Sequence, residues 1–341
     1  MSANPRALRA LPGAPAVSAV PAVLAGVLLL AACGSQSAAP GGDGRVRAEA
    51  LCPSEFAQNG SRASGTPTPL PLPSADGTTG GDVKVTGLYA WGSGSGCGAD
   101  FSAGFEVTNS GTEKAAYTVT LGFLSSSGTI VDHVERTVAP VGPGRTVKGT
   151  AGLGASMGDA SDVANVKVEK VRSVPADEAS SASGPCPASG VHLYADKGDA
   201  AMGLRVVGLH LVNCGTRPYR LDGYPKLELL DEDHDSVDGV RILDGTDAIS
   251  TGVGGTGSPR PVVLKPGEAA QTTLAWRNTT TFGEPVNAPY VRVWAKPGAR
   301  PVTVVPELDL GTTGKLGVGA WAKDESFRGD AGATPRPTVV P

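Results

Sequence analysis

Aromatic and charged side chains are scarce in this chain, at 5% and 18% of its 341 residues, whereas glycine and proline are abundant, with 48 and 28 residues. A long coiled coil is excluded and a helical bundle nearly so, because both need sustained repeats of strong helix formers. The formal net charge of −4 gives no general attraction to nucleic acid, which is not expected as a partner. The length allows about two domains.

Charge is nearly absent from the start of the chain, where Arg6 and Arg9 are the only charged residues before Asp43. An apolar run follows them and ends in Leu-Ala-Ala-Cys at Cys33. A basic start, a short apolar core and small residues at the end predict a secretory signal peptide over residues 1–32. The run of roughly a dozen apolar residues is too short for a membrane span, which takes about 20.

The Leu-Ala-Ala-Cys ending resembles the bacterial lipobox. This resemblance implies a lipoprotein that carries a diacylglycerol on the sulfur of Cys33. Its partner would then be the membrane, reached through the N-terminal diacylglyceryl-cysteine, and it would lie on the extracytoplasmic face of the cell membrane. Two acyl chains make a stable anchor. The alternative is an ordinary signal peptide in which Cys33 has no role.

The remaining cysteines are four in number and are expected to form disulfides, because an even count is typical of an exported chain. They are Cys52, Cys97, Cys186 and Cys214. Four cysteines allow three connectivities, and we favour 52–97 with 186–214 because each pair then stays inside one domain. Zinc is the competing interpretation, but the chain has no Cys-x-x-Cys spacing and no histidine at finger spacing.

Composition divides the exported part of the chain. Small polar residues at 33–50 predict a flexible tether. We expect a β-rich domain over 51–175, a linker over 176–185, a second β-rich domain over 186–322 and a disordered tail over 323–341. The proline-rich segment 59–81 is either a spacer or a loop of the first domain. Alternating apolar residues predict strands, as at 117–123, and others are expected at 191–194, 204–212, 226–230, 261–264, 269–276, 290–294 and 302–305.

The two β-rich domains resemble each other in short motifs. Asn109-Ser-Gly-Thr corresponds to Asn213-Cys-Gly-Thr, and each domain has a late Pro-Gly, at Gly144 and Gly267. Strands about ten residues apart with Gly- or Ser-rich turns between them are typical of a sandwich. The sequence therefore predicts an all-β protein with two tandem immunoglobulin-like β-sandwich modules joined by a short linker.

Several motifs of the second domain resemble a known family when taken in order. They are Cys186-Pro, the segment 211–219, Gly223-Tyr-Pro, Leu264-Lys-Pro-Gly and Leu274-Ala-Trp. Over residues 186–322 this set resembles the bacterial domain of unknown function 4232, found mostly in exported actinobacterial proteins and lipoproteins. The resemblance implies an extracytoplasmic location and brings no established reaction or ligand.

Motifs with catalytic or metal-binding chemistry are few. Ser156 lies in a Gly-x-Ser-x-Gly sequence, but a β-rich stretch follows where a hydrolase elbow needs a helix, so a simple connection is favoured. Asp231, Asp233 and Asp235 could offer Ca²⁺ hard oxygen ligands, although a turn is the favoured interpretation. Neither a cofactor nor a firm metal site is expected.

Exposed aromatic side chains would mark a binding face, and Tyr219 and Tyr224 beside the Gly-Tyr-Pro turn are the first candidates. We therefore expect a non-catalytic binding or adaptor module for a cell-envelope protein or glycan. The alternative is a receptor for a small molecule or metal ion. A serine hydrolase that uses Ser156 is a distant third.

Overall fold

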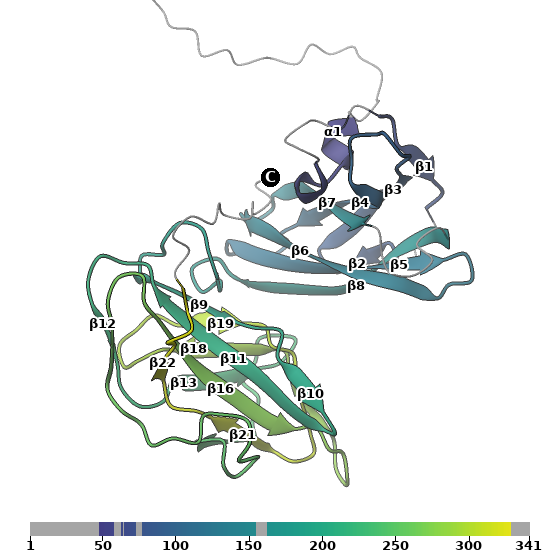
Figure 1. The fold of residues 1–341 in the computed structure, drawn as a ribbon. Coiled ribbons are helices and arrows are strands. Elements are labelled where there is room, and N and C mark those ends of the chain that lie inside the picture. The colour runs from purple at the N-terminus through teal and green to yellow at the C-terminus, as the bar shows by residue number, and fades with distance from the viewer. Residues whose placement is uncertain (1–47, 58–62, 64, 73–76, 155–161, 329–341) are drawn as a thin grey trace, which may run out of the picture. The chain divides into compact units, whose positions relative to one another are not determined.

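The computed structural model describes residues 48–57, 63, 65–72, 77–154 and 162–328 (Figure 1). The predicted signal peptide, Cys33 and Ser156 lie outside the described residues. Strands dominate the described part, so the all-β prediction is confirmed. Two short helical turns, α1 (Ala48–Leu51) and η1 (Ser54–Phe56), precede the first strand. No helix among the described residues is long and apolar enough to cross a membrane.

The N-terminal half, residues 48–175, is built from two antiparallel sheets (Figure 1). The first has the order β1-β3-β4-β7 with β2 beside β3, and its strands are β1 (Thr68–Leu70), β2 (Thr79–Gly80), β3 (Val83–Ala90), β4 (Ala99–Thr108) and β7 (Thr146–Gly154). The second has the order β6-β5-β8, with strands β5 (Ala115–Ser125), β6 (Ile130–Val141) and β8 (Val163–Pro175).

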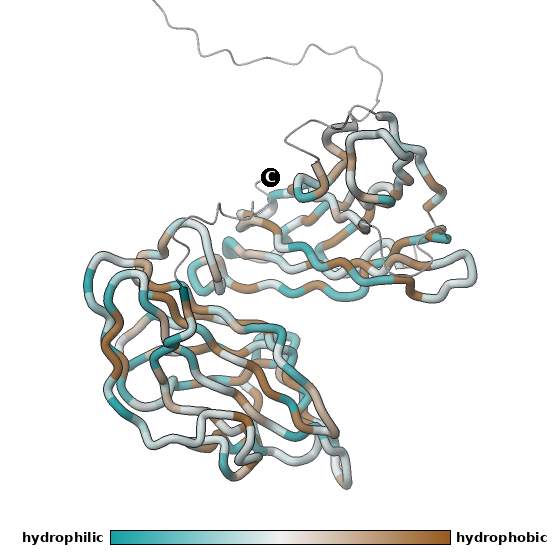
Figure 2. Tube along the Cα trace, in the orientation of Figure 1, coloured by the Kyte–Doolittle hydropathy of each residue, from teal (hydrophilic) through white to brown (hydrophobic). Residues whose placement is uncertain are grey.

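One hydrophobic core lies between these two sheets and takes side chains from both of them. The alternation predicted at 117–123 is confirmed, because Tyr117, Val119, Leu121 and Phe123 are all at most 2% exposed. The same alternation of apolar and polar residues is visible along the strands in Figure 2. Burial of the apolar side chains on one face of each strand is what holds the two sheets together.

The proline-rich segment contributes a strand, since β1 pairs with β3 from Thr68↔Ala90 to Leu70↔Leu88. Pro69 is tolerated because β1 is the edge strand of its sheet. The alternative in which this segment belongs to the first domain is therefore the correct one for residues 68–70.

The C-terminal half, residues 186–328, also places sheets around one core. The largest sheet has the order β10-β11-β16-β21-β14, with β9 beside β11 and β22 beside β16; its strands are β9 (Val191–Ala195), β10 (Asp199–Ala201), β11 (Leu204–Asn213), β14 (Arg241–Asp244), β16 (Ala269–Arg277), β21 (Lys315–Val318) and β22 (Ala322–Lys323). Smaller sheets pair β13 (Lys226–Leu230), β18 (Tyr290–Trp294) and β19 (Val302–Val304), β12 (Tyr219–Leu221) with β15 (Val262–Leu264), and β17 (Val286–Ala288) with β20 (Leu308–Gly311).

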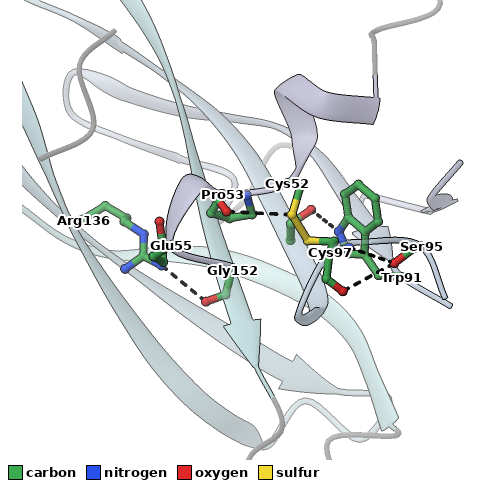
Figure 3. The surroundings of a disulfide bond; sticks show 9 residues. Cys52, Pro53, Glu55, Trp91, Ser95, Cys97, Arg136 and Gly152 are labelled. Atoms are coloured by element: carbon green, nitrogen blue, oxygen red, sulfur yellow. Dashed lines mark hydrogen bonds and ion pairs between the residues drawn. A yellow bond between two sulfur atoms is a disulfide. The ribbon is translucent and has the colours of Figure 1, made fainter. Parts of the chain in front are cut away.

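Both disulfides join the expected partners. Cys52 is bonded to Cys97 with a Cα–Cα distance of 5.9 Å, and Cys186 to Cys214 with 5.6 Å. Figure 3 shows the first of these beside Trp91, whose indole N–H donates to the Ser102 hydroxyl at 2.8 Å. Each disulfide closes a loop within one half of the chain.

Asn109 is the centre of a buried turn in the N-terminal half, at 1% exposure. Its side-chain amide donates to the carbonyls of Glu113 and Val141, at 2.7 Å each. Its side-chain oxygen accepts the Gly111 N–H at 2.9 Å. One side chain thus forms hydrogen bonds with two main-chain carbonyls and one main-chain N–H, so these buried polar groups have partners.

Asn213, also 1% exposed, makes the same set of bonds in the C-terminal half. Its amide donates to the carbonyls of Arg217 and Leu264, at 2.9 and 3.0 Å, and its oxygen accepts the Gly215 N–H at 3.1 Å. The Pro-Gly turns correspond as well, because Gly144 donates to the Asn109 carbonyl and Gly267 to that of Asn213, both at 2.8 Å. The repeat expected from the sequence is present in these hydrogen bonds.

The expected linker and tail are more ordered than the sequence indicates. Glu178, in the linker, accepts hydrogen bonds from Arg292 and Thr303 at 2.8 and 2.7 Å, so residues 176–185 are not a free connector. Lys323, at the start of the tail, lies in β22 opposite Ala270. Residues 48–50, which were expected to belong to the tether, lie in α1. Composition alone missed these contacts, because the residues that make them are polar.

Candidate functional site

A pocket of about 660 Å³ lies in the C-terminal half, between the outer face of its largest sheet and a glycine-rich loop, residues 251–261. We call it the glycine-loop pocket. Its floor comes from β11 and β16 and its walls from the loop and the segment 320–323; the lining residues are Asp196, Val206, Gly208, His210, Val253, Gly254, Gly255, Gly257, Ser258, Arg260, Pro261, Val262, Gln271, Thr272, Thr273, Ala320, Trp321, Ala322 and Lys323.

Strand register sets the floor of the pocket. His210 on β11 lies directly opposite Gln271 on β16, and Gln271 lies opposite Ala322 on β22. On β11 the neighbours Leu209 and Leu211 are fully buried in the core, so alternation places the His210 side chain on the outer face. Two strands therefore present the polar side chains of His210 and Gln271 to the pocket, and β22 adds Ala322 beside them.

Asp196 organises one wall. Its Oδ1 accepts the N–H groups of Gly198 and Gly208, at 2.8 and 2.9 Å, while its Oδ2 lies 3.2 Å from His210 Nε2. A Cβ on Gly208 would lie only 2.4 Å from Asp196 Oδ2 and would displace this carboxylate. The His210 ring stacks on Tyr194 with centroids 5.1 Å apart. Burial, with the nearby carboxylates of Asp324 and Asp196, raises the pKa of Tyr194.

Close glycine contacts hold the loop over the sheet. Gly255 has a positive φ of 73°, and a Cβ on it would lie 2.9 Å from the Cα of Gly319. The Thr246 hydroxyl donates to the Gly254 carbonyl on the same stretch. Only glycine allows both this backbone conformation and this close approach. The glycine residues therefore fix the position of the loop that covers the pocket.

The pocket carries two basic side chains at its rim. Lys323 is paired with Glu268 at 3.1 Å. Arg260 is exposed and has no hydrogen bond or ion pair with any described residue. Trp321 is also in the lining, but it is only 2% exposed, and its indole N–H donates to the Ala295 carbonyl at 2.9 Å. The indole is therefore part of the hydrophobic core and leaves almost no surface to the pocket.

The two aromatic candidates from the sequence, Tyr219 and Tyr224, have different surroundings. Tyr219 lines a smaller pocket of about 330 Å³, and Lys296 Nζ lies 3.7 Å from its ring centroid. Burial raises the pKa of Tyr219. Tyr224 is half-buried and does not line that pocket. Across the described residues Phe282, at 97% exposure, is the one fully exposed aromatic side chain.

The acidic segment 231–235 forms a turn. The Asp231 carboxylate accepts the main-chain N–H groups of Asp233 and Asp235, at 3.0 and 2.9 Å. His234 occupies a left-handed conformation with φ of 65° and stacks on Tyr290. Within the described ranges, no group of three or more His, Cys, Asp or Glu side chains is arranged to hold a metal ion.

One serine–histidine pair escaped the sequence analysis. The Ser181 hydroxyl lies 2.8 Å from His192 Nδ1, and His192 is only 6% exposed. Burial lowers the pKa of His192, against a hydrogen bond with the main chain of Gly184. Ser181 also uses its own N–H to bind the Leu193 carbonyl, so the pair fastens the segment 176–185 to β9. No carboxylate of the described residues bonds to this histidine.

The sequence did not identify Arg260 and Gln271 as pocket residues. The run Gly252-Val-Gly-Gly-Thr-Gly indicates the loop, because so many glycines are not typical of a strand.

The comparisons with known proteins add one family. Residues 186–322 match the domain of unknown function DUF4232. No curated protein matches the chain.

Proposed function

We propose that this protein is an exported, lipid-anchored binding protein without catalytic activity, and that its C-terminal half holds a component of the cell envelope. The N-terminal sequence up to Cys33 supports export and acylation. Two disulfides support an oxidising compartment. The membrane would be contacted through a diacylglyceryl-cysteine, on the extracytoplasmic face of an actinobacterial cell.

The glycine-loop pocket is the observation that carries the binding function. Its volume of about 660 Å³ falls in the range of small-ligand pockets, about 300–1,000 Å³. A glycan is favoured over a protein partner, because the pocket is a cavity of ligand size lined by polar side chains such as Gln271 and Ser258. All of its lining residues except Lys323 also lie inside residues 186–322, the segment that matches the family.

The proposal includes a finer description of the fold, as two immunoglobulin-like modules in tandem. The two sheets of the N-terminal half that share one core support it. So does the repeated turn at Asn109 and Asn213, which ties one strand end to a distant strand in each half. Such modules bind through loops carried on a rigid frame.

The experiment replaces Ser258, on the rim of the pocket, with a photo-crosslinking amino acid in the native host. We expect irradiation to join the protein to an envelope saccharide. The matched control places the same group at the exposed Asp132 of the N-terminal half, where we expect no adduct. Identical products from both positions, or none from Ser258, would contradict the binding function.

The anchor is examined in the same cells. With Cys33→Ala the crosslinkable protein should leave the membrane fraction, because the acylated sulfur is lost, while Cys33 wild type should stay in it. A Cys33→Ala protein that remains in the membrane fraction would refute lipid anchoring. This readout does not depend on whether a saccharide is bound.

A further inference from the structure

The polar groups of the glycine-loop pocket divide into satisfied and unsatisfied ones. The one carboxylate in the lining, Asp196, is occupied by two main-chain N–H groups and His210. Among the described residues, no partner is recorded for the side chains of Arg260, Gln271 and Ser258. A guanidinium, an amide and a hydroxyl are thus free to bind a ligand, and donors outnumber acceptors among them.

The lining of the pocket carries two basic side chains, Arg260 and Lys323, and one carboxylate, Asp196. Arg260 carries an unpaired positive charge and Lys323 adds a second, which Glu268 offsets from outside the lining. Asp196 is directed at His210 and at main-chain N–H groups. Guanidinium groups bind carboxylates and phosphates with paired, charge-assisted hydrogen bonds. An anionic group is therefore the complement of this rim.

The apolar part of the lining limits the ligand further. Val206 and Val253 are half-buried and lie in the lining, whereas Trp321 is 2% exposed and belongs to the core. Apolar surface next to free hydrogen-bond donors suits a ring that has C–H groups and a hydroxyl-bearing edge. The lining contains both kinds of surface within one pocket.

We propose that the glycine-loop pocket binds an anionic saccharide, in which a carboxylate or phosphate contacts Arg260 and ring hydroxyls contact Gln271 and Ser258. The inference rests on the proposed function and specifies the chemistry of its ligand. The shared requirement is one negative group on a hydroxyl-rich ring. Uronic acids and sugar phosphates both meet it.

Titration calorimetry of the purified full chain tests this with three probes: a galacturonic-acid oligosaccharide, a hexose phosphate and a neutral oligosaccharide of similar length. We expect at least one anionic probe to bind and the neutral one to bind at least about tenfold more weakly, as expected for the loss of a charge-assisted bond. Which anionic probe binds more tightly identifies the source of the charge.

Variants locate the site. Arg260→Ala should weaken binding of the anionic probe about tenfold or more, and Gln271→Ala should weaken it less, since its amide is neutral. The matched control is Arg241→Ala, which removes an exposed arginine outside the pocket lining and should leave affinity unchanged. Binding by the unmodified chain should also weaken as salt rises, a readout that does not depend on any variant.

Equal affinity for neutral and anionic probes would overturn the inference and leave the proposed function standing. The inference would also be overturned if the Arg260→Ala and Arg241→Ala proteins bound the anionic probe with the same affinity. If no probe binds, the inference is wrong, and the crosslink from Ser258 decides the proposed function separately. A crosslinked protein in place of a saccharide would also end the inference while retaining a binding role.

Discussion

The outer face of equivalent strands is covered by side chains in the N-terminal half and forms a pocket in the C-terminal half. In the N-terminal half the outer face of β4 and β7 is packed with side chains: Pro53 and Phe56 lie so close to Gly152 that a Cβ there would be 2.8 and 2.7 Å from them. In the C-terminal half the corresponding face of β11 and β16 lies under the glycine-rich loop and is open to solvent as the 660 Å³ pocket.

The two halves also differ in the number of residues between each central asparagine and the distant strand to which it donates. From Asn109 to the carbonyl of Val141 there are 32 positions, whereas from Asn213 to the carbonyl of Leu264 there are 51. The additional residues of the C-terminal half include the glycine-rich loop. On a frame of hydrogen bonds that both halves share, the C-terminal half thus has a longer connection, and its glycine-rich loop borders a cavity where the other half has a packed face.

Removal of a disulfide is expected to have the largest effect and to separate the halves. Cys52→Ser with Cys97→Ser should cost about 4 kcal/mol, and Cys186→Ser with Cys214→Ser slightly less, because the sequence separations are 45 and 28 residues. Hydrogen exchange should show the first pair loosening β4 and β7 around Phe56 and leaving β16 protected. Loss of protection in both halves from either pair would show that the halves are not independent.

The two central asparagines should have matching effects of intermediate size. Asn109→Ala and Asn213→Ala should each cost roughly 2–4 kcal/mol, because each leaves a buried carbonyl without its donor. Asn278→Ala is the matched control, since that side chain has one hydrogen bond, to Asp309, at a half-buried site. Urea unfolding measures all three. If only one central asparagine matters, the repeated turn is not equivalent in the two halves.

The smallest expected difference between the halves is the loss of stability at acidic pH. Burial holds the pKa of His192 below its usual 6.5, so the unfolded chain takes up a proton before the folded one. The C-terminal half should therefore lose stability as pH falls below 6.5, and His192→Gln should reduce that loss. Thermal unfolding in a Trp91→Phe variant measures it, because Trp276, Trp294 and Trp321 all lie in the C-terminal half. A stability that stays constant from pH 7.5 to 5.5 would contradict this.

Local pattern predicted much of the frame. Residues 226–230 and 290–294 were expected as strands and are β13 and β18 with the same bounds. Both disulfides have the expected partners, because each cysteine pair lies within one β-rich segment. The candidate site was predicted less well. Neither of the two aromatic candidates lines the glycine-loop pocket, and Tyr219 lines the smaller pocket of about 330 Å³.

The glycine-loop pocket could not be predicted because its residues are distant in sequence. His210, Gln271 and Ala322 become neighbours through strand register alone. The same holds for Glu178, whose role depends on Arg292 more than a hundred positions later. A polar residue in a linker and a polar residue on a binding wall have the same local pattern.

The sequence by itself determined the β class, because strand periodicity and turn residues act over a few positions, and it favoured the cysteine pairs that the structure has. Only the tertiary structure decided that side chains cover the outer face of β4 and β7, whereas the outer face of β11 and β16 borders a pocket. That outcome depends on whether bulky side chains such as Phe56 or a glycine-rich loop lie over the sheet, and close packing between distant segments sets it.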